Sequence, residues 1–277
     1  MNIAVIQARM ASRRLPGKAL MLLGSYPLIY YVISRTKKIQ GIDKIILATS
    51  HRKENDPLAT YADSLGIEVF RGDEDNVLER FHLVAQATGA KNIIRVTGDN
   101  PLIDFNSMSL LLKYHCDNRN DYTCAAGFPV GSIGDIFSRQ ALEESYLHAN
   151  GKELNDHVDL YILENQNKFK IMLYQLKPDL STYRWTIDSQ SDLDIMKAFL
   201  NTASESIIAL GMNQLIDKAV QARFSETMTS RKVEVSKENM HSAQLAKKIV
   251  NKCDIQKHAL ACWDSKNEQV VFNNERG

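Results

Sequence analysis

The chain has 277 residues, of which 44% are hydrophobic, and a formal net charge of +1 at pH 7. This length predicts one large domain, alone or with a smaller appendage, and the near-zero charge argues against a general nucleic-acid binder, which is usually basic. No apolar run approaches the roughly 20 residues needed to span a bilayer, and the N-terminal segment lacks the pattern of a signal peptide. We therefore expect a cytoplasmic protein without membrane insertion.

The first part of the chain alternates short apolar runs with amphipathic segments. Runs that suit buried strands lie at residues 3–8, 44–50, 67–72 and 92–97. Segments with helical spacing or helix-end signals lie between them, at residues 26–39, 56–66 and 74–89. This alternation predicts an α/β fold, with a mostly parallel sheet and helices on both faces. Because ligands bind beyond the carboxyl ends of such strands, the polar clusters at 9–18, 71–80 and 98–100 should converge.

The pattern changes from about Asp121. The Gly-rich stretch at 122–138 predicts either a small antiparallel excursion or a substrate loop, and residues 168–176 and 181–188 read as further strands. Ser189 and Asp192 predict a capping box that opens a helix. Beyond residue 225 the composition becomes charged and polar, with one amphipathic candidate at 240–250. We expect residues 226–277 to form an appendage, either a small added unit or a dimerisation element.

The spacing of the cysteines matches no usual zinc pattern, and their number does not indicate a disulfide scaffold. They are Cys116, Cys124, Cys253 and Cys262. We expect reduced thiols, with a Cys253–Cys262 pair as the alternative.

The loop after the first predicted strand concentrates four cations, Arg9, Arg13, Arg14 and Lys18. Arg supplies fork-shaped donors, Lys a compact charge, and Gly17 lets the backbone approach a ligand closely, so the loop suits a polyphosphate. A solvated basic turn is the alternative, which the position after a strand and the "LPGK" sequence disfavour. The P-loop and dinucleotide fingerprints are both absent, so phosphate binding would use side chains as much as backbone.

Four blocks occur in order over roughly residues 2–200: "IQARMASRRLPGKAL", "FRGDEDNVLERF", "RVTGDNPLID" and "RWTIDSQSDL". They resemble the cytidylyltransferases that activate acidic sugars, such as 3-deoxy-manno-octulosonate cytidylyltransferase, and more closely the spore-coat-polysaccharide-type branch. The resemblance implies a Rossmann-like fold of the nucleotide-diphospho-sugar transferase type. It also implies a nucleotidyltransferase in which a sugar hydroxyl attacks the α-phosphorus of CTP, with catalysis by positioning and charge neutralisation.

The resemblance implies nucleotide-binding roles for Ala8, Arg9, Ser12, Arg14, Lys18, Arg71, Asp75 and Arg80. Arg9 and Lys18 are the implied catalytic residues. Arg13 stands where the family has a small residue, and either a phosphate contact or a solvent-exposed side chain fits it. Asp73 and Asp75 could equally serve the dipole of the following helix.

Asp99 and Asp188 match the acidic positions of the family, which implies a Mg²⁺ ion held between them and the substrate phosphates. The alternatives are a turn-forming Asp before Asn-Pro and a residue that precedes a helix cap. The sugar pocket is where the resemblance thins, because Val130 replaces a family arginine. Asp135 and His157 are the implied sugar-binding residues, and a structural histidine is the alternative for His157. The changed pocket indicates a substrate unlike that of the closer relatives.

The expected function is CTP-dependent activation of a sugar, expected to be acidic, as its CMP derivative for surface polysaccharide synthesis. The enzyme would be a Mg²⁺-dependent homodimer with a nucleotidyltransferase domain at 1–225. The alternatives are a nucleotide-sugar-dependent glycosyltransferase, a nucleotidyltransferase for another NTP, and a non-catalytic regulatory homologue. The absence of a second Asp in "TGDNP" disfavours the glycosyltransferase, and the presence of Lys18 and Asp99 disfavours the non-catalytic homologue.

Overall fold

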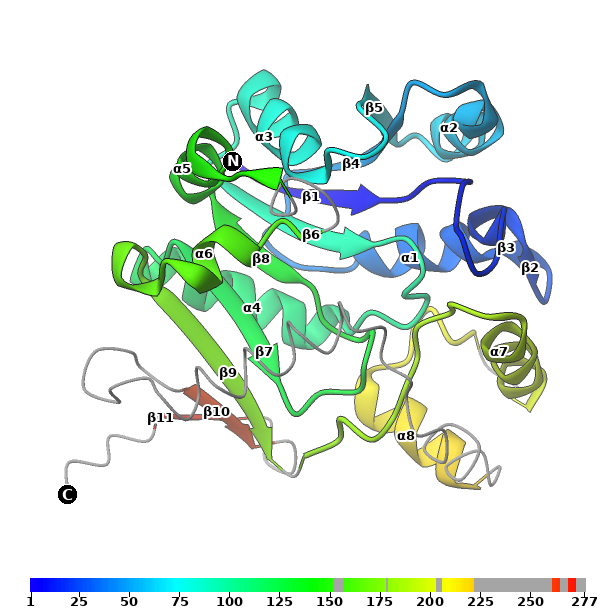
Figure 1. The fold of residues 1–277 in the computed structure, drawn as a ribbon. Coiled ribbons are helices and arrows are strands. Elements are labelled where there is room, and N and C mark those ends of the chain that lie inside the picture. The colour runs from blue at the N-terminus through cyan, green and yellow to red at the C-terminus, as the bar shows by residue number, and fades with distance from the viewer. Residues whose placement is uncertain (152–156, 178, 203–205, 222–260, 265–268, 273–277) are drawn as a thin grey trace.

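The computed structural model describes residues 1–151, 157–177, 179–202, 206–221, 261–264 and 269–272. These residues form a nine-stranded sheet flanked by helices, together with a separate two-stranded hairpin (Figure 1). In spatial order the sheet contains β5 (Glu68–Gly72), β4 (Lys44–Ser50), β1 (Asn2–Gln7), β6 (Asn92–Thr97), β8 (Asp135–Ser138), β7 (Tyr122–Ala126), β9 (Ile171–Lys177), β10 (Ala261–Asp264) and β11 (Gln269–Phe272). The hairpin consists of β2 (Leu22–Leu23) and β3 (Tyr26–Pro27).

The sheet is mostly parallel, as the sequence predicts. β1 lies between β4 and β6 and runs parallel to both, β4 runs parallel to β5, and β9 runs parallel to β7 and β10. β8 is antiparallel to β6 and β7, so the Gly-rich stretch forms the predicted antiparallel excursion. β11 is antiparallel to β10 at the far edge. The carboxyl ends of the parallel strands therefore share one edge, where ligand-binding loops gather.

Helices cover both faces of the sheet. They are α1 (Leu28–Thr36), α2 (Asp56–Ser64), α3 (Val77–Thr88), α4 (Phe105–Asn118), α5 (Arg139–His148), α6 (Leu160–Glu164), α7 (Gln190–Thr202) and α8 (Met212–Gln221). Side-chain caps begin several of them: the Asn76 side chain accepts from the Glu79 N–H, and the Asp104 side chain from the Ser107 N–H. α3 ends as predicted at Gly89, which has a φ of 66°.

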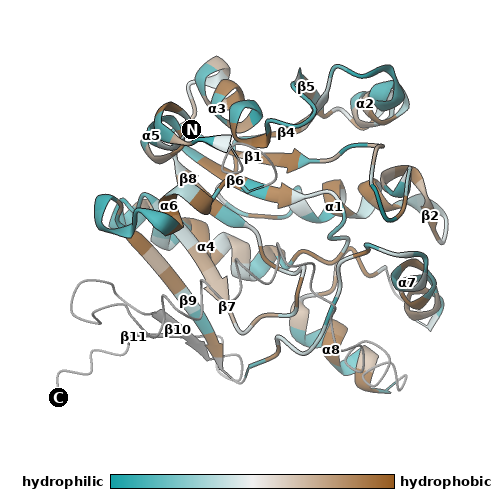
Figure 2. Cartoon of the chain, viewed as in Figure 1, coloured by the Kyte–Doolittle hydropathy of each residue, from teal (hydrophilic) through white to brown (hydrophobic). Residues whose placement is uncertain are grey.

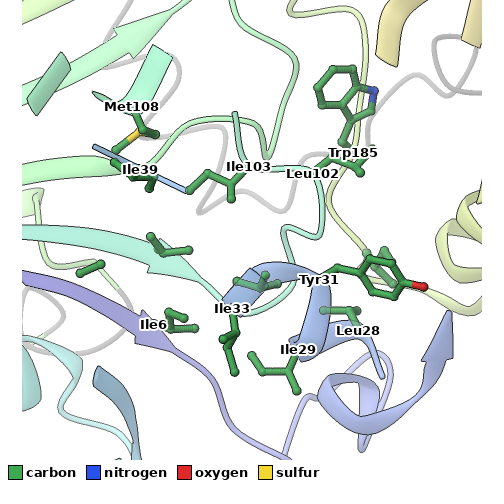
Figure 3. Close-up of a cluster of buried hydrophobic side chains, with 14 of the residues drawn as sticks. Ile6, Leu28, Ile29, Tyr31, Ile33, Ile39, Leu102, Ile103, Met108 and Trp185 are labelled. Carbon is green, nitrogen blue, oxygen red and sulfur yellow. The ribbon is translucent and has the colours of Figure 1, made fainter. Parts of the chain in front are cut away.

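Alternate residues of each strand enter two separate apolar clusters. On β1, Ile3 and Val5 pack with side chains of α3, α5 and α6, whereas Ala4 and Ile6 pack with those of α1, α2, α4, α7 and α8. Figure 3 shows part of the second cluster, in which Ile6 lies near α1 and Met108 and Trp185 contribute from further along the chain. The hydrophobic residues along β1 in Figure 2 are thus buried on both faces, as expected for a central parallel strand.

The prediction of a strand at residues 181–188 is wrong. Among the described residues this segment makes a single bridge, between Val130 and Arg184, and beyond that bridge its backbone bonds to a different loop, at Asp99. The Trp185 N–H donates to the Val130 carbonyl at 2.8 Å, and the Ile187 N–H donates to the Asp99 carbonyl at 2.9 Å. The apolar side chains are buried because the segment crosses other loops, and this crossing carries Asp188 to Asp99.

Part of the predicted appendage extends the main sheet as β10 and β11. The helix predicted at 240–250 and the alternative Cys253–Cys262 pair fall on residues outside the described ones, because neither 240–250 nor Cys253 is among them. Cys116 and Cys124 are free thiols, as predicted. No helix within the described ranges is both long enough and apolar enough to cross a membrane.

Candidate functional site

The loop between β1 and a short 3₁₀ helix at Lys18–Leu20 carries the cations to the carboxyl edge of the sheet. It closes where the Gly17 N–H donates to the Met10 carbonyl at 2.8 Å, and Gly17 has a φ of 75°, which favours glycine. The side chain of Leu15 is buried in the apolar cluster that also contains Ala4 and Ile6, which holds the loop against the protein. Arg13 and Arg14 are exposed beside it, and Ser12 is half-buried. Because Arg13 is as exposed as Arg14, both alternatives for Arg13, a phosphate contact and a solvent-exposed side chain, stay predictions.

Lys18 contacts two carboxylates that are far apart in the sequence. Its Nζ donates to Oδ2 of Asp99 at 2.8 Å, to the Ile187 carbonyl at 2.8 Å and to Oδ1 of Asp188 at 3.1 Å. Arg14 also contacts Oδ1 of Asp188, at 2.9 Å, and Arg184 donates to Oδ2 of the same carboxylate. We call Lys18, Arg14, Arg184, Asp99 and Asp188 the charge cluster.

Local structure fixes both carboxylates of the charge cluster. Asp99 follows Gly98, where an added Cβ would lie 2.5 Å from the Ala8 Cβ, so only glycine lets the ends of β1 and β6 approach this closely. Asp188 lies two residues before α7, and the predicted capping box is present. Oδ2 of Asp192 accepts from the Ser189 N–H at 2.8 Å and from the Asp188 N–H at 3.0 Å.

Within the charge cluster, Lys18 and Asp188 each stabilise the charged form of the other. Burial alone would lower the pKa of Lys18, but Asp99 and Asp188 outweigh it and hold this pKa above its ordinary value. Burial would likewise raise the pKa of Asp188, but Lys18, Arg14 and Arg184 outweigh it and hold this pKa below its ordinary value. Three cations facing two carboxylates give a net charge of +1. The cluster therefore attracts anions while still offering carboxylate oxygens to a metal ion.

Arg9 takes part in a second polar group, which contains three residues that the sequence did not single out. Its Nη1 donates to the Glu74 carbonyl at 3.2 Å and to Oε1 of Glu74 at 3.3 Å. Oε2 of the buried Glu74 carboxylate accepts from the Ser50 hydroxyl, and the Asn55 amide donates to that hydroxyl at 2.8 Å. Asn55 also accepts from the Met10 N–H at 2.8 Å. Glu74, Ser50 and Asn55 thus join the loops after β5 and β4 to the loop after β1.

The other residues of the "FRGDEDNVLERF" block have different surroundings. Arg71, on β5, pairs with Asp56 at 2.5 Å, and Asp75 has 74% of its side chain exposed, 3.8 Å from Arg9. Arg80 is buried, and its guanidinium donates to the carbonyls of Asp73 and Glu74. It supports the loop from within the protein, so the structure does not place it on the ligand-facing surface. For Arg80 we revise the interpretation from ligand contact to loop positioning.

The two residues assigned to sugar binding lie apart from the charge cluster. Asp135 begins β8 and accepts hydrogen bonds from Arg95 and from the Tyr122 hydroxyl. The same hydroxyl also contacts the carboxylate of Asp159. His157 is half-buried, two residues before Asp159. Arg95, Tyr122 and Asp159 were missed by sequence reasoning, because nothing in their spacing links them.

A family model described as cytidylyltransferase matches residues 3–226. The chain belongs to the cytidylyltransferase family. It is similar to the spore coat polysaccharide biosynthesis protein SpsF of Bacillus subtilis, with 34% identity over 208 residues, which are 73% of this chain and 87% of that protein. It is also similar to the 3-deoxy-manno-octulosonate cytidylyltransferase of Geobacter sulfurreducens, with 36% identity over 107 residues, 38% of this chain and 41% of that one.

A solved structure of another cytidylyltransferase has a similar fold. A cytidylyltransferase from Leptospira borgpetersenii serovar Hardjo-bovis has a TM-score of 0.77 and 26% identity, covering 84% of this chain and 98% of that one. The resemblance carried by the four sequence blocks and the predicted fold class are therefore confirmed. The protein is a nucleotidyltransferase.

Proposed function

We propose that this cytidylyltransferase transfers CMP from CTP to a hydroxyl group of a sugar, expected to be acidic, for surface polysaccharide synthesis, and that pyrophosphate leaves. The observation that carries the proposal is the charge cluster, which combines a net charge of +1 with two carboxylates that meet at one ammonium group. Such a site suits a triphosphate that arrives with a divalent cation. The names of the relatives support cytidine and polysaccharide synthesis.

The donor set fits Mg²⁺. Asp99 and Asp188 already share one cation, the Lys18 ammonium, so their oxygens are close enough to approach a single ion. The described part of the chain has no group of three or more His, Cys, Asp or Glu side chains that could hold a metal. Mg²⁺ commonly binds through one or two carboxylates and fills its other positions with water and substrate phosphates. When bound there, it would neutralise negative charge on the reacting phosphoryl group.

The cations of the loop take the triphosphate in this proposal. Lys18 and Arg14 turn from the carboxylates to phosphate oxygens when the nucleotide arrives, which frees Asp99 and Asp188 for the metal. Arg9 approaches the triphosphate from the other side, oriented by Glu74. These contacts accelerate transfer by holding the α-phosphorus in place and compensating charge as the pyrophosphate leaves.

The remaining residues complete the substrate sites. We assign Ala8 and Ser12 to the backbone that borders the triphosphate, and Arg71 and Asp75 to the base and ribose. Asp135 and His157 are assigned to the acceptor sugar. The assignment of Asp135 and His157 rests on the family resemblance and, for Asp135, on its place opposite Arg95 near the carboxyl end of β6. A cytoplasmic location and a homodimer stay predictions.

A screen of the four ribonucleoside triphosphates by thermal shift, with and without Mg²⁺, tests the nucleotide part of the proposal. We expect CTP with Mg²⁺ to raise the melting temperature most. Stabilisation by GTP or UTP but not by CTP would contradict the proposal.

A further inference from the structure

A largely buried polar group links the three strands β6, β8 and β7. Arg95 on β6 lies directly opposite Asp135 on β8, and its Nη1 donates to Oδ2 of Asp135 at 3.1 Å. The Tyr122 hydroxyl, from β7, donates to Oδ1 of Asp135 at 3.0 Å and lies 3.5 Å from Oδ2 of Asp159. Arg95 also donates through Nε to the Gln7 side chain at 3.2 Å. We call Arg95, Asp135, Tyr122 and Asp159 the Arg95 cluster.

The position of the Arg95 cluster suits a second substrate of the same reaction. Gln7 and Arg95 stand near the carboxyl ends of β1 and β6. Arg95 precedes Asp99 by four residues, a distance of at most about 14 Å along an extended chain. A monosaccharide bound over the Arg95 cluster would therefore reach toward the proposed metal and α-phosphorus.

The Arg95 cluster has an open side. The side chains of Arg95 and Asp135 are 16% and 24% exposed, whereas Tyr122 and Asp159 beneath them are buried. β8 can approach β6 this closely because residue 134 is glycine: an added Cβ would lie 2.1 Å from the Arg95 carbonyl oxygen. The unusual stretch before Asp135 is thus what brings this carboxylate against the guanidinium.

The Arg95 cluster contains more negative than positive charge. Two carboxylates face one guanidinium, and burial, with the charge of Asp159 second, raises the pKa of Asp135 to about 6. Two carboxylates beside a single guanidinium are a poor way to stabilise a protein, and titratable groups perturbed in this way gather at functional sites. The excess also defines a preference, because carboxylate oxygens accept hydrogen bonds and repel anions.

We propose that the Arg95 cluster binds the acceptor sugar through a side of the sugar that bears hydroxyl or amide N–H groups, and turns its carboxylate away toward the positive charge cluster. This inference rests on the proposed function, since it assumes a sugar acceptor. Asp135 accepts from the sugar and Arg95 holds Asp135 in place. The buried Asp159 and Tyr122 lie beneath them and position the Asp135 carboxylate. The Arg95 cluster therefore selects which ring substituents the acceptor can carry.

Asp135→Asn and Asp159→Asn test the inference, with Asp117→Asn on the exposed surface of α4 as the matched control. A panel of 2-keto-3-deoxy sugar acids that includes 3-deoxy-manno-octulosonate is titrated by calorimetry into each protein with Mg²⁺ and a non-hydrolysable CTP analogue. The titrations are made above the Asp135 pKa of about 6. We expect the tightest panel sugar to bind each cluster variant at least about ten-fold more weakly, as loss of a charged hydrogen bond implies. Binding of the CTP analogue should not change.

A second comparison uses a monophosphate ester of that sugar, esterified at a ring or side-chain hydroxyl. The wild-type protein should discriminate against the ester, and Asp135→Asn should reduce that discrimination, which a purely structural role would not do. Equal sugar affinity in the cluster variants and the control would overturn the inference. Failure of every panel sugar to bind, while the CTP analogue binds, would also overturn it but leave the nucleotide part of the proposed function standing.

Discussion

Lys18→Met removes the cation that Asp99 and Asp188 share, and should convert the charge cluster into a nucleotide-independent metal site. In the wild-type protein the Lys18 side chain is 12% exposed and its ammonium group is bonded to both carboxylates, so a divalent cation must displace it. Among the described residues, Lys18 is the sole cation paired with Asp99, whereas Asp188 keeps Arg14 and Arg184.

The size of the effect follows from the charge removed. Unit charges about 4 Å apart near a protein surface interact by about 4 kcal/mol, and partial exposure to water reduces this to about 2 kcal/mol. Such a difference corresponds to about thirty-fold tighter binding of a divalent cation. Turnover of CTP should fall at least about 100-fold in the same variant, because Lys18 is also proposed to hold the triphosphate.

Electron paramagnetic resonance of free Mn²⁺ measures this binding without any nucleotide present. Lys18→Met should bind Mn²⁺ about thirty-fold more tightly than the wild-type protein, and Asp99→Asn in the same background should abolish the gain. Arg13→Met is the matched control, because it removes an exposed cation from the same loop. If the wild-type protein and Lys18→Met bind Mn²⁺ equally well, the ammonium does not compete with the metal and the reasoning fails.

Three further predictions concern other buried polar groups. Glu74→Gln weakens the contact that orients Arg9, so the KM for CTP should rise about ten-fold with little change in melting temperature, and an unchanged KM would separate Glu74 from nucleotide binding. Burial lowers the pKa of His115 to about 4 from its ordinary 6.5, and because the unfolded chain takes up the proton first, stability should fall by about 3 kcal/mol as pH drops through this range. Urea unfolding of His115→Gln should lack this fall. Arg35→Met leaves the carbonyls of Ile103 and Leu210 without their donor, and chemical denaturation should show a loss of about 3 kcal/mol, with a loss below 1 kcal/mol arguing against the role.

The sequence predicts the central strands because their signal is local. Residues 3–8, 44–50, 67–72 and 92–97 are short apolar runs, and they form β1, β4, β5 and β6 within about two residues. The segment at 181–188 looks the same locally, since Trp185 and Ile187 are apolar and buried. It forms no strand because its backbone partners, Val130 and Asp99, belong to loops that only the folded chain brings to it.

The candidate site likewise contains residues that the sequence predicts and residues that only the folded chain brings together. Lys18, Asp99 and Asp188 sit in recognisable blocks, and the structure brings the three side chains together. Glu74 and Ser50 are joined across 24 residues by the pairing of β4 with β5, and nothing within the block that contains Glu74 indicates that contact.

Arg80 shows that a residue within a recognisable sequence block can still be assigned the wrong role, because its side chain is buried. Its position within the block does not reveal which way its side chain points. The helix register of α3 turns the guanidinium under the loop, toward the carbonyls of Asp73 and Glu74.

Pyrophosphate release from CTP tests the central claim most directly. The assay combines the full chain, Mg²⁺, the panel of 2-keto-3-deoxy sugar acids and each of the four ribonucleoside triphosphates in turn. The account predicts Mg²⁺-dependent release with CTP and a sugar acid, and loss of that release in Asp99→Asn with an unchanged melting curve. Faster release from UTP or GTP than from CTP, or full activity in Asp99→Asn, would contradict it.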